Sequence, residues 1–141
     1  MNKTWFVDID GTILKHRNNF QIESSQLAGF SGTDKDGEEL LPSVADFFNT
    51  IPETDQIVLI TARHSTDREI TEGALERFGL LNRIDSIVYD LPSGPRILIN
   101  DIKPAGSEDN ILPDKEVDTE YAINVRRDEG LRHLINDDGN C

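Results

Sequence analysis

The sequence predicts an α/β protein with a parallel sheet whose faces are covered by helices. Short apolar runs alternate along the chain with stretches of helical spacing, an order that is typical of parallel sheets. Polar residues directly follow several of these runs, at the sheet edge where such folds bind ligands. The chain has 141 residues, which suits a single domain, 1–141, with a core of its own.

The first half of the chain contains two apolar runs separated by a long irregular stretch and a helical pattern. Residues 4–9 (TWFVDI) and 56–60 (QIVLI) are predicted to be buried strands. Residues 13–41 carry several glycines and no clear period, which predicts a loop that could include a short hairpin. A helix is predicted to begin near Pro42 and to end at Pro52. Its apolar face comprises Val44, Phe47, Phe48 and Ile51.

The second half predicts one more clear helix and three strands. Thr66 followed by Glu69 is a capping-box pattern, so a helix is expected to begin there and to end at Gly79. Apolar runs then predict strands over 86–89 (SIVY), 96–99 (RILI) and 120–125 (EYAINV). Residues 103–119 are predicted to form a loop, and residues 127–135 a short closing helix.

Charge and composition narrow the classes of partner. The chain has 14 Lys and Arg against 27 Asp and Glu, a net charge of −13 that disfavours binding to nucleic acid or to anionic membranes. No segment approaches a membrane span, so a cytoplasmic protein is expected. The single cysteine, Cys141, cannot form an internal disulfide and is interpreted as an inert thiol.

Three of the predicted strands end in groups that could perform chemistry. The first ends in Asp8-Ile9-Asp10-Gly11-Thr12, the second in Thr61-Ala62-Arg63, and the fourth in Asn100-Asp101, with Lys103 close behind. Two carboxylates spaced by one residue can share a Mg²⁺ ion, and one of them can attack phosphorus while the other transfers a proton. Cations and hydroxyl groups can stabilise a transferring phosphoryl group.

Each of these groups also has a plain structural interpretation. Asp10-Gly11 could mark a turn, Thr61 could cap the next helix, and Asn100-Asp101 could end a strand. The complete string from Asp8 to Thr12 after an apolar strand favours the functional interpretation, and it strengthens the others.

The segments FVDIDGTIL, VLITAR and ILINDIKP resemble motifs I, II and IV of the haloacid dehalogenase-like superfamily of phosphohydrolases. The resemblance spans residues 4 to about 103. It implies that the parallel sheet is Rossmann-like and that the chain is a phosphoric monoester hydrolase. The family often has a Gly-Asp or Asp-Asp pair where this chain has Asn100-Asp101.

The resemblance also implies a role for each site residue. Asp8 would be the nucleophile that forms an aspartyl-phosphate, Asp10 the general acid and base, and Thr61 a phosphoryl ligand. The Asp8 carboxylate, the Asp10 backbone carbonyl and Asp101, beside Asn100, would hold Mg²⁺. Arg63 resembles an arginine that helps to bind phosphate in some members without a cap domain. The expected substrate-binding residues are Gly11, Thr12, Ala62, Arg63 and Lys103.

The cation of motif III, usually a lysine, has no clear counterpart. Arg96 lies just before the predicted fourth strand and is the first choice, with Lys103 as the alternative. Arginine supplies the same charge with a fork of donors, so such a replacement is physically reasonable.

The spacing of the motifs leaves no room for a large cap domain. The 48 residues 13–60 and the 32 residues 64–95 suffice only for the predicted elements. At most a small flap in 15–41 could cover the site, unless association of copies covers it. A small phosphorylated metabolite, such as a sugar phosphate or a nucleotide, is the favoured substrate. The alternatives are a polynucleotide 3′-phosphatase-like enzyme, a phosphotransferase and a non-catalytic phosphoryl- or metal-binding module.

One acidic segment and two histidines have simpler interpretations. Residues 32–39 (GTDKDGEE) faintly resemble a calcium loop, but the glycine does not fall at the sixth position, so they are interpreted as a solvated loop. His16 and His64 lack metal-ligand spacing and are interpreted as surface groups or groups supporting the site.

Overall fold

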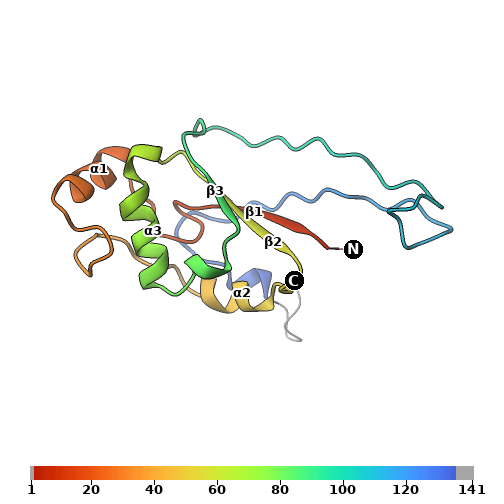
Figure 1. Ribbon diagram of the computed structural model, residues 1–141, viewed down its shortest axis with the longest axis horizontal. Coiled ribbons are helices and arrows are strands. Elements are labelled where there is room, and N and C mark those ends of the chain that lie inside the picture. The colour runs from red at the N-terminus through yellow and green to blue at the C-terminus, as the bar shows by residue number, and fades with distance from the viewer. Residues whose placement is uncertain (1, 136–141) are drawn as a thin grey trace. The chain divides into compact units, whose positions relative to one another are not determined.

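The computed structural model describes residues 2–135, and Cys141 lies outside this range. The chain divides into two compact units where the sequence predicted one domain. One unit comprises Lys3–Ser93 together with the chain from Val125 onward, and the other centres on Gly94–Asn124. All the α-helices and β-strands among the described residues lie in the first unit (Figure 1).

The first unit is built on a sheet of three parallel strands in the order β1-β2-β3 (Figure 1). In chain order its elements are β1 (Thr4–Asp8), α1 (Asn19–Leu27), α2 (Val44–Thr50), β2 (Gln56–Ile60), α3 (Arg68–Arg77) and β3 (Ser86–Val88). Short 3₁₀ turns cover Ser65–Asp67, Leu81–Arg83 and Arg132–Leu134. The prediction of an α/β protein with a parallel sheet is therefore confirmed.

The register of the sheet aligns the carboxyl ends of β1 and β2. Asp8 at the end of β1 pairs with Ile60 at the end of β2. β3 continues the pattern, because Val88 pairs with Ile60 and its carbonyl accepts a hydrogen bond from the amide of Thr61 at 3.0 Å. The residues that follow β1 and β2 therefore leave the sheet at the same edge.

The core lies against the sheet and is almost entirely aliphatic and aromatic. Ile57 and Leu59 of β2 are fully buried, and helices α2 and α3 supply Phe47 and Leu75. The ring of Trp5 meets that of Phe47 edge to face, with centroids 5.7 Å apart, a favoured geometry for aromatic pairs. The predicted strands 4–9, 56–60 and 86–89 and the predicted helix after Pro42 all contribute to this core.

Segment 15–41 differs from the predicted loop, because it contains helix α1. This helix was missed because only one of its residues, Ile22, is buried, so it has no apolar period. Its start is fixed by a reciprocal capping box between Asn18 and Gln21. The two ends of the segment are joined by antiparallel bonds, from the Lys15 amide to the Glu39 carbonyl and from the Leu41 amide to the Ile13 carbonyl, each 2.9 Å long.

The capping box predicted for the next helix is wrong. A 3₁₀ turn over Ser65–Asp67 precedes α3, and the helix begins at Arg68 with no hydrogen bond from the side chain of its N-cap residue, Asp67. The apolar face predicted for this helix is nevertheless present, since Ile70 and Ala74 are fully buried.

The predicted strands over 96–99 and 120–125 are also wrong. Residues 94–124, all of which the structure describes, contain no helix or strand, and only one isolated bridge, between Lys103 and Val117. Ile97 and Ile99 are 86% and 92% exposed. An apolar run forms a strand only where a neighbouring strand completes its hydrogen bonds.

The predicted closing helix over 127–135 shrinks to a 3₁₀ turn at Arg132–Leu134. The chain leading into it approaches the start of α2 closely, because the Leu131 amide donates to the Pro42 carbonyl at 3.1 Å. A Cβ on Gly130 would lie 2.2 Å from that carbonyl oxygen, so only glycine fits there. Between residues 2 and 135, no helix combines the length and the apolar character needed to cross a membrane.

Candidate active site

The chain turns sharply after β1 and brings Thr12 back toward Asp8. Gly11 has a positive φ of 83°, and the amides of Thr12, Ile13 and Leu14 all donate to the Ile9 carbonyl. The hydroxyl of Thr12 donates to a carboxylate oxygen of Asp8 at 3.3 Å. The turn thus presents the partly buried Asp8 and Asp10 at the carboxyl end of β1.

Thr61 and Arg63 follow the end of the adjacent strand, β2. The Thr61 hydroxyl accepts a hydrogen bond from the Arg63 amide at 3.0 Å, which closes the turn after the strand. Within this unit the structure therefore gathers most of the predicted site residues at the carboxyl ends of two neighbouring parallel strands. These residues are Asp8, Asp10, Gly11, Thr12, Thr61, Ala62 and Arg63.

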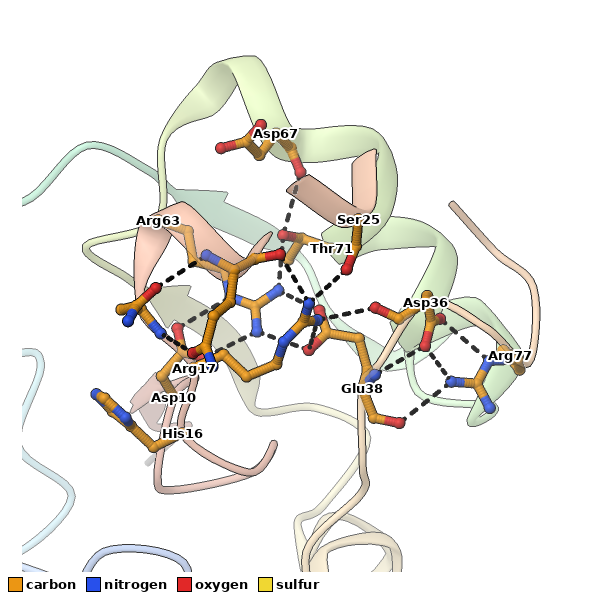
Figure 2. Close-up of polar contacts among 12 residues, drawn as sticks. Asp10, His16, Arg17, Ser25, Asp36, Glu38, Arg63, Asp67, Thr71 and Arg77 are labelled. Carbon is orange, nitrogen blue, oxygen red and sulfur yellow. Dashed lines mark hydrogen bonds and ion pairs between the residues drawn. The ribbon is translucent and has the colours of Figure 1, made fainter. Parts of the chain in front are cut away.

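Arg63 is buried, and its guanidinium group makes all its hydrogen bonds within the protein (Figure 2). Nε and Nη2 donate to the two carboxylate oxygens of Asp10 at 2.9 and 2.8 Å. Nη1 and Nη2 donate to Glu38 at 2.5 and 3.0 Å, and Nη1 also donates to the Thr71 hydroxyl at 3.1 Å. These contacts account for the five N–H groups of an arginine, so a direct bond to phosphate would cost Arg63 one of them.

The charge of Arg63 is stabilised by its two acidic partners. Burial alone would lower the pKa of the guanidinium, but the hydrogen bonds that it donates to Asp10 and Glu38 outweigh burial and raise the pKa above its ordinary value. Arg63 is therefore a permanent cation placed between two carboxylates.

Glu38 and Arg17 extend this chain of charges into segment 15–41 (Figure 2). The Glu38 side chain is fully buried and lies 3.1 Å from Nη1 of Arg17. Arg17 also donates to the hydroxyl of Ser25 at 2.7 Å and to the Asp36 carbonyl at 2.9 Å. Asp10, Arg63, Glu38 and Arg17 form a continuous row of alternating charges, which we call the charge row.

Asp36 anchors the same segment to helix α3. It accepts hydrogen bonds from Nε and Nη2 of Arg77 at 3.2 and 2.7 Å, and its Oδ1 accepts one from the Glu38 amide at 2.8 Å. Asp36 and Glu38 are 0% and 6% exposed, so the interpretation of residues 32–39 as a solvated loop is wrong for these two, whereas the other residues of the segment are exposed. Their partners lie far away in the sequence, and no local pattern could have identified either residue.

A second, unpredicted segment packs on the turn after β1. The Asp128 amide donates to the Gly11 carbonyl at 2.9 Å, and the Asp128 carboxylate accepts from the His16 amide at 2.7 Å. A Cβ on Gly11 would lie 3.1 Å from Cγ of Arg127. His64, the other histidine considered above, is exposed, and its Nε2 lies 3.3 Å from the side-chain amide of Asn19.

The other predicted site residues, Arg96, Asn100, Asp101 and Lys103, belong to the second unit. There Nζ of Lys103 lies 3.0 Å from Asp109 and 3.4 Å from Asp101. Hydrogen bonds that Lys103 donates to Asp109 and Asp101 raise its pKa, so it stays cationic. Arg96 donates to the Gly94 carbonyl at 2.9 Å, and Asn100 to the Thr119 carbonyl at 3.1 Å.

The donors around Asp8 suit a Mg²⁺ ion in their chemistry. Among residues 2–135, no cluster of three acidic, histidine or cysteine side chains is arranged to hold a metal. Mg²⁺ sites, however, commonly use one or two carboxylates with water as the remaining ligands. The Asp8 carboxylate and the Asp10 backbone carbonyl are hard oxygen donors on one turn. The residues therefore fit the ion.

Comparison of the chain with protein-family models, with curated proteins and with solved structures found no match.

Proposed function

We propose that this chain is a Mg²⁺-dependent phosphatase with a Rossmann-like fold, which hydrolyses a phosphate monoester through an aspartyl-phosphate on Asp8. The observation that carries the proposal is the alignment of β1 and β2, which brings Asp8 and Thr61 to one edge of a parallel sheet. Ligands bind at that edge in open α/β sheets. The hydrogen bond from Thr12 to Asp8 adds support, because it orients the carboxylate that would attack.

The reaction would take place in two displacements. A carboxylate oxygen of Asp8 attacks phosphorus, the bond from phosphorus to the ester oxygen breaks, and Asp10 gives a proton to the departing alcohol. Asp10 then takes a proton from a water molecule that attacks the same phosphorus. The bond between phosphorus and Asp8 breaks, which releases inorganic phosphate and restores the carboxylate.

The contacts of Asp10 are compatible with this proton transfer. An ionised carboxylate offers about four acceptor positions, and the fork of Arg63 uses two of them. The Asp10 side chain is 16% exposed, whereas that of Arg63 is fully buried. The remaining positions on Asp10 are therefore the ones available to a leaving group or to water.

The other residues would bind and orient the substrate. The hydroxyl of Thr61 would donate to a phosphoryl oxygen, and the cation of motif III, Lys103 or Arg96, would neutralise charge. When bound, Mg²⁺ would supply positive charge that stabilises the phosphoryl group, and the Asp8 carboxylate and the Asp10 carbonyl would hold it. The resemblance to motif IV implies Asp101 as a further ligand.

The substrate class follows from charge and from the size of segment 15–41. A net charge of −13 repels polyanions, which favours a small phosphorylated metabolite such as a sugar phosphate or a nucleotide. Segment 15–41 contributes one helix of nine residues and is tied to α3 by the Asp36–Arg77 ion pair. It is too small to form a cap domain.

The test is a panel of phosphate monoesters assayed for phosphate release in Mg²⁺. The panel includes sugar phosphates, nucleotides and a 3′-phosphorylated oligonucleotide, with Asp8→Asn as the control. We expect turnover of a small monoester that is lost in Asp8→Asn, while the circular dichroism spectrum is unchanged. Preference for the oligonucleotide would favour the polynucleotide alternative. Binding without turnover across the panel would overturn the proposal in favour of a non-catalytic module.

A further inference from the structure

We propose that Glu38 is a positioning residue for Asp10 and acts on it through Arg63. The inference rests on the proposed function, since it concerns the proton-transfer step that Asp10 would perform. It starts from the order of charges in the charge row, in which Glu38 has a cation on each side and is fully buried, while Asp10 stands at one end with 16% of its side chain exposed.

The geometry of the contacts allows Glu38 to act at a distance. The guanidinium group is planar, so fixing one edge of it fixes the direction of the other edge. Glu38 binds both Nη atoms of Arg63, and Thr71 binds Nη1 as well. The orientation of the Nε and Nη2 donors that meet Asp10 is therefore set by groups that do not themselves touch Asp10.

Glu38 is in turn fixed from its other side. Arg17 contacts its Oε1, and Arg17 is held by the Gln21 carbonyl and by the Ser25 hydroxyl in helix α1. Segment 15–41 thereby supplies a buried acidic residue to a site whose other members follow β1 and β2.

Stability alone does not account for this arrangement. Buried ion pairs are often no more stabilising than apolar residues of similar volume, because both charges lose their hydration. A row that served only to hold segment 15–41 on the core would have no need to end on a carboxylate that reaches the surface. The Asp36–Arg77 pair already performs such an anchoring role between the same segment and α3.

The test compares Glu38→Gln with Asp36→Asn, a matched loss of one buried carboxylate in the same segment. Both are assayed on an aryl phosphate with a good leaving group and on an alkyl phosphate with a poor one. We expect Glu38→Gln to lower kcat for the alkyl ester at least ten times more than for the aryl ester, with little change in KM. Asp36→Asn should affect both esters equally. Equal effects of Glu38→Gln on the two esters would overturn the proposal.

A double-mutant cycle with Asp10→Asn provides the second arm. If Glu38 acts through Asp10, Glu38→Gln should lower kcat no further in the Asp10→Asn background, and the two changes should also be non-additive in urea unfolding. Additive effects in both measurements would overturn the proposal.

Absence of turnover in the wild type would instead count against the proposed function, and the unfolding cycle would still decide whether Glu38 and Asp10 are coupled. If Glu38→Gln does not fold, Glu38→Asp replaces it, because it keeps the charge on a shorter side chain. We expect Glu38→Asp also to lower kcat more for the alkyl ester than for the aryl ester. Equal losses of kcat on the two esters would again refute the role.

Discussion

The guanidinium group of Arg63 donates two parallel hydrogen bonds to Asp10, from Nε to Oδ2 at 2.9 Å and from Nη2 to Oδ1 at 2.8 Å. The two residues are 53 positions apart and follow the ends of adjacent strands. Such bidentate pairs fix the orientation of a carboxylate as well as its position. Arg63 therefore fixes the orientation of the Asp10 carboxylate while its own side chain stays buried.

Removal of Arg63 should therefore destabilise the fold. Arg63→Met leaves Glu38 buried beside only one cation, and breaking a buried ion pair typically costs about 3–5 kcal/mol. Urea unfolding followed by tryptophan fluorescence would measure the loss. Arg126→Ala, at an exposed pair, is the control and should change little. An Arg63→Met protein with wild-type stability and only a raised KM would instead indicate direct contact with the substrate.

Asp10→Asn tests the proton-transfer role. General acid–base assistance typically contributes about 10²–10⁴-fold to a rate, so kcat should fall within that range for an alkyl phosphate. The fall should be smaller for an aryl phosphate, whose leaving group needs no proton. Steady-state kinetics on the two esters would measure the difference. A small and equal effect on both would exclude Asp10 as the acid.

Local patterns were sufficient to predict the parts of the fold whose side chains face the core. The strand β2 was found as an apolar run whose Ile57 and Leu59 are fully buried, and the helix α3 was found because Ile70 and Ala74, also fully buried, repeat at helical spacing. Helix α1 was missed because its one buried residue leaves no period to detect. The run RILI at 96–99 was predicted to be a strand because it is apolar. That prediction is wrong, since a strand also needs a neighbouring strand to complete its hydrogen bonds.

Site residues, too, could be predicted where a local sequence pattern marks them and not where their contacts are distant in the sequence. Asp8, Asp10 and Thr61 could be predicted because each follows an apolar strand in a recognisable string. Glu38 could not, because its role depends on Arg63, which lies 25 positions further along the chain. A buried partner at that separation becomes visible only when the chain is folded.

Two buried aspartates should respond to pH in opposite directions. Burial raises the pKa of Asp67, whose Oδ2 has no hydrogen-bond partner within the described part of the chain, and the charge of Glu23 raises it further. A raised folded pKa means that stability is lost as pH rises from the unfolded value near 3.8 through the folded value. The advantage of Asp67→Asn over the wild type should therefore grow with pH across that interval.

Asp55 provides the contrast. Burial opposes ionisation there as well, but hydrogen bonds from the Lys3 amide and the Trp5 indole outweigh burial and lower the pKa. Its contribution is present above the unfolded value of about 3.8 and is lost as pH falls through the folded pKa. Asp55→Asn should thus be most harmful near neutral pH. Urea titrations between pH 3 and pH 7 would measure both variants, and parallel curves would refute the assignment.

Activity should require Mg²⁺, and Asp101 should affect the concentration needed. The resemblance of ILINDIKP to motif IV implies that Asp101 is a metal ligand, so Asp101→Ala should move half-maximal activity to a higher Mg²⁺ concentration. Asp109→Ala is a matched control, because Asp109 contacts the same Lys103 and is also exposed. Full activity in excess chelator would refute the metal requirement, and an identical Mg²⁺ titration in Asp101→Ala would refute the ligand.

The remaining question is which cation neutralises the phosphoryl group. The two candidates were first separated by a predicted strand, which the structure does not contain. The contact of Lys103 with Asp101, at 3.4 Å, now favours Lys103, because it links the cation to the carboxylate proposed as a metal ligand. Arg96 is exposed, and it donates to the nearby Gly94 carbonyl at 2.9 Å. We therefore expect Lys103→Ala to lose both turnover and binding of a fluoride analogue of the phosphorylated intermediate. Arg96→Ala should keep both, as measured by phosphate release and by calorimetric titration with the analogue. The reverse result would restore Arg96 as the motif III cation, and retention of both properties in both variants would show that neither residue performs this role.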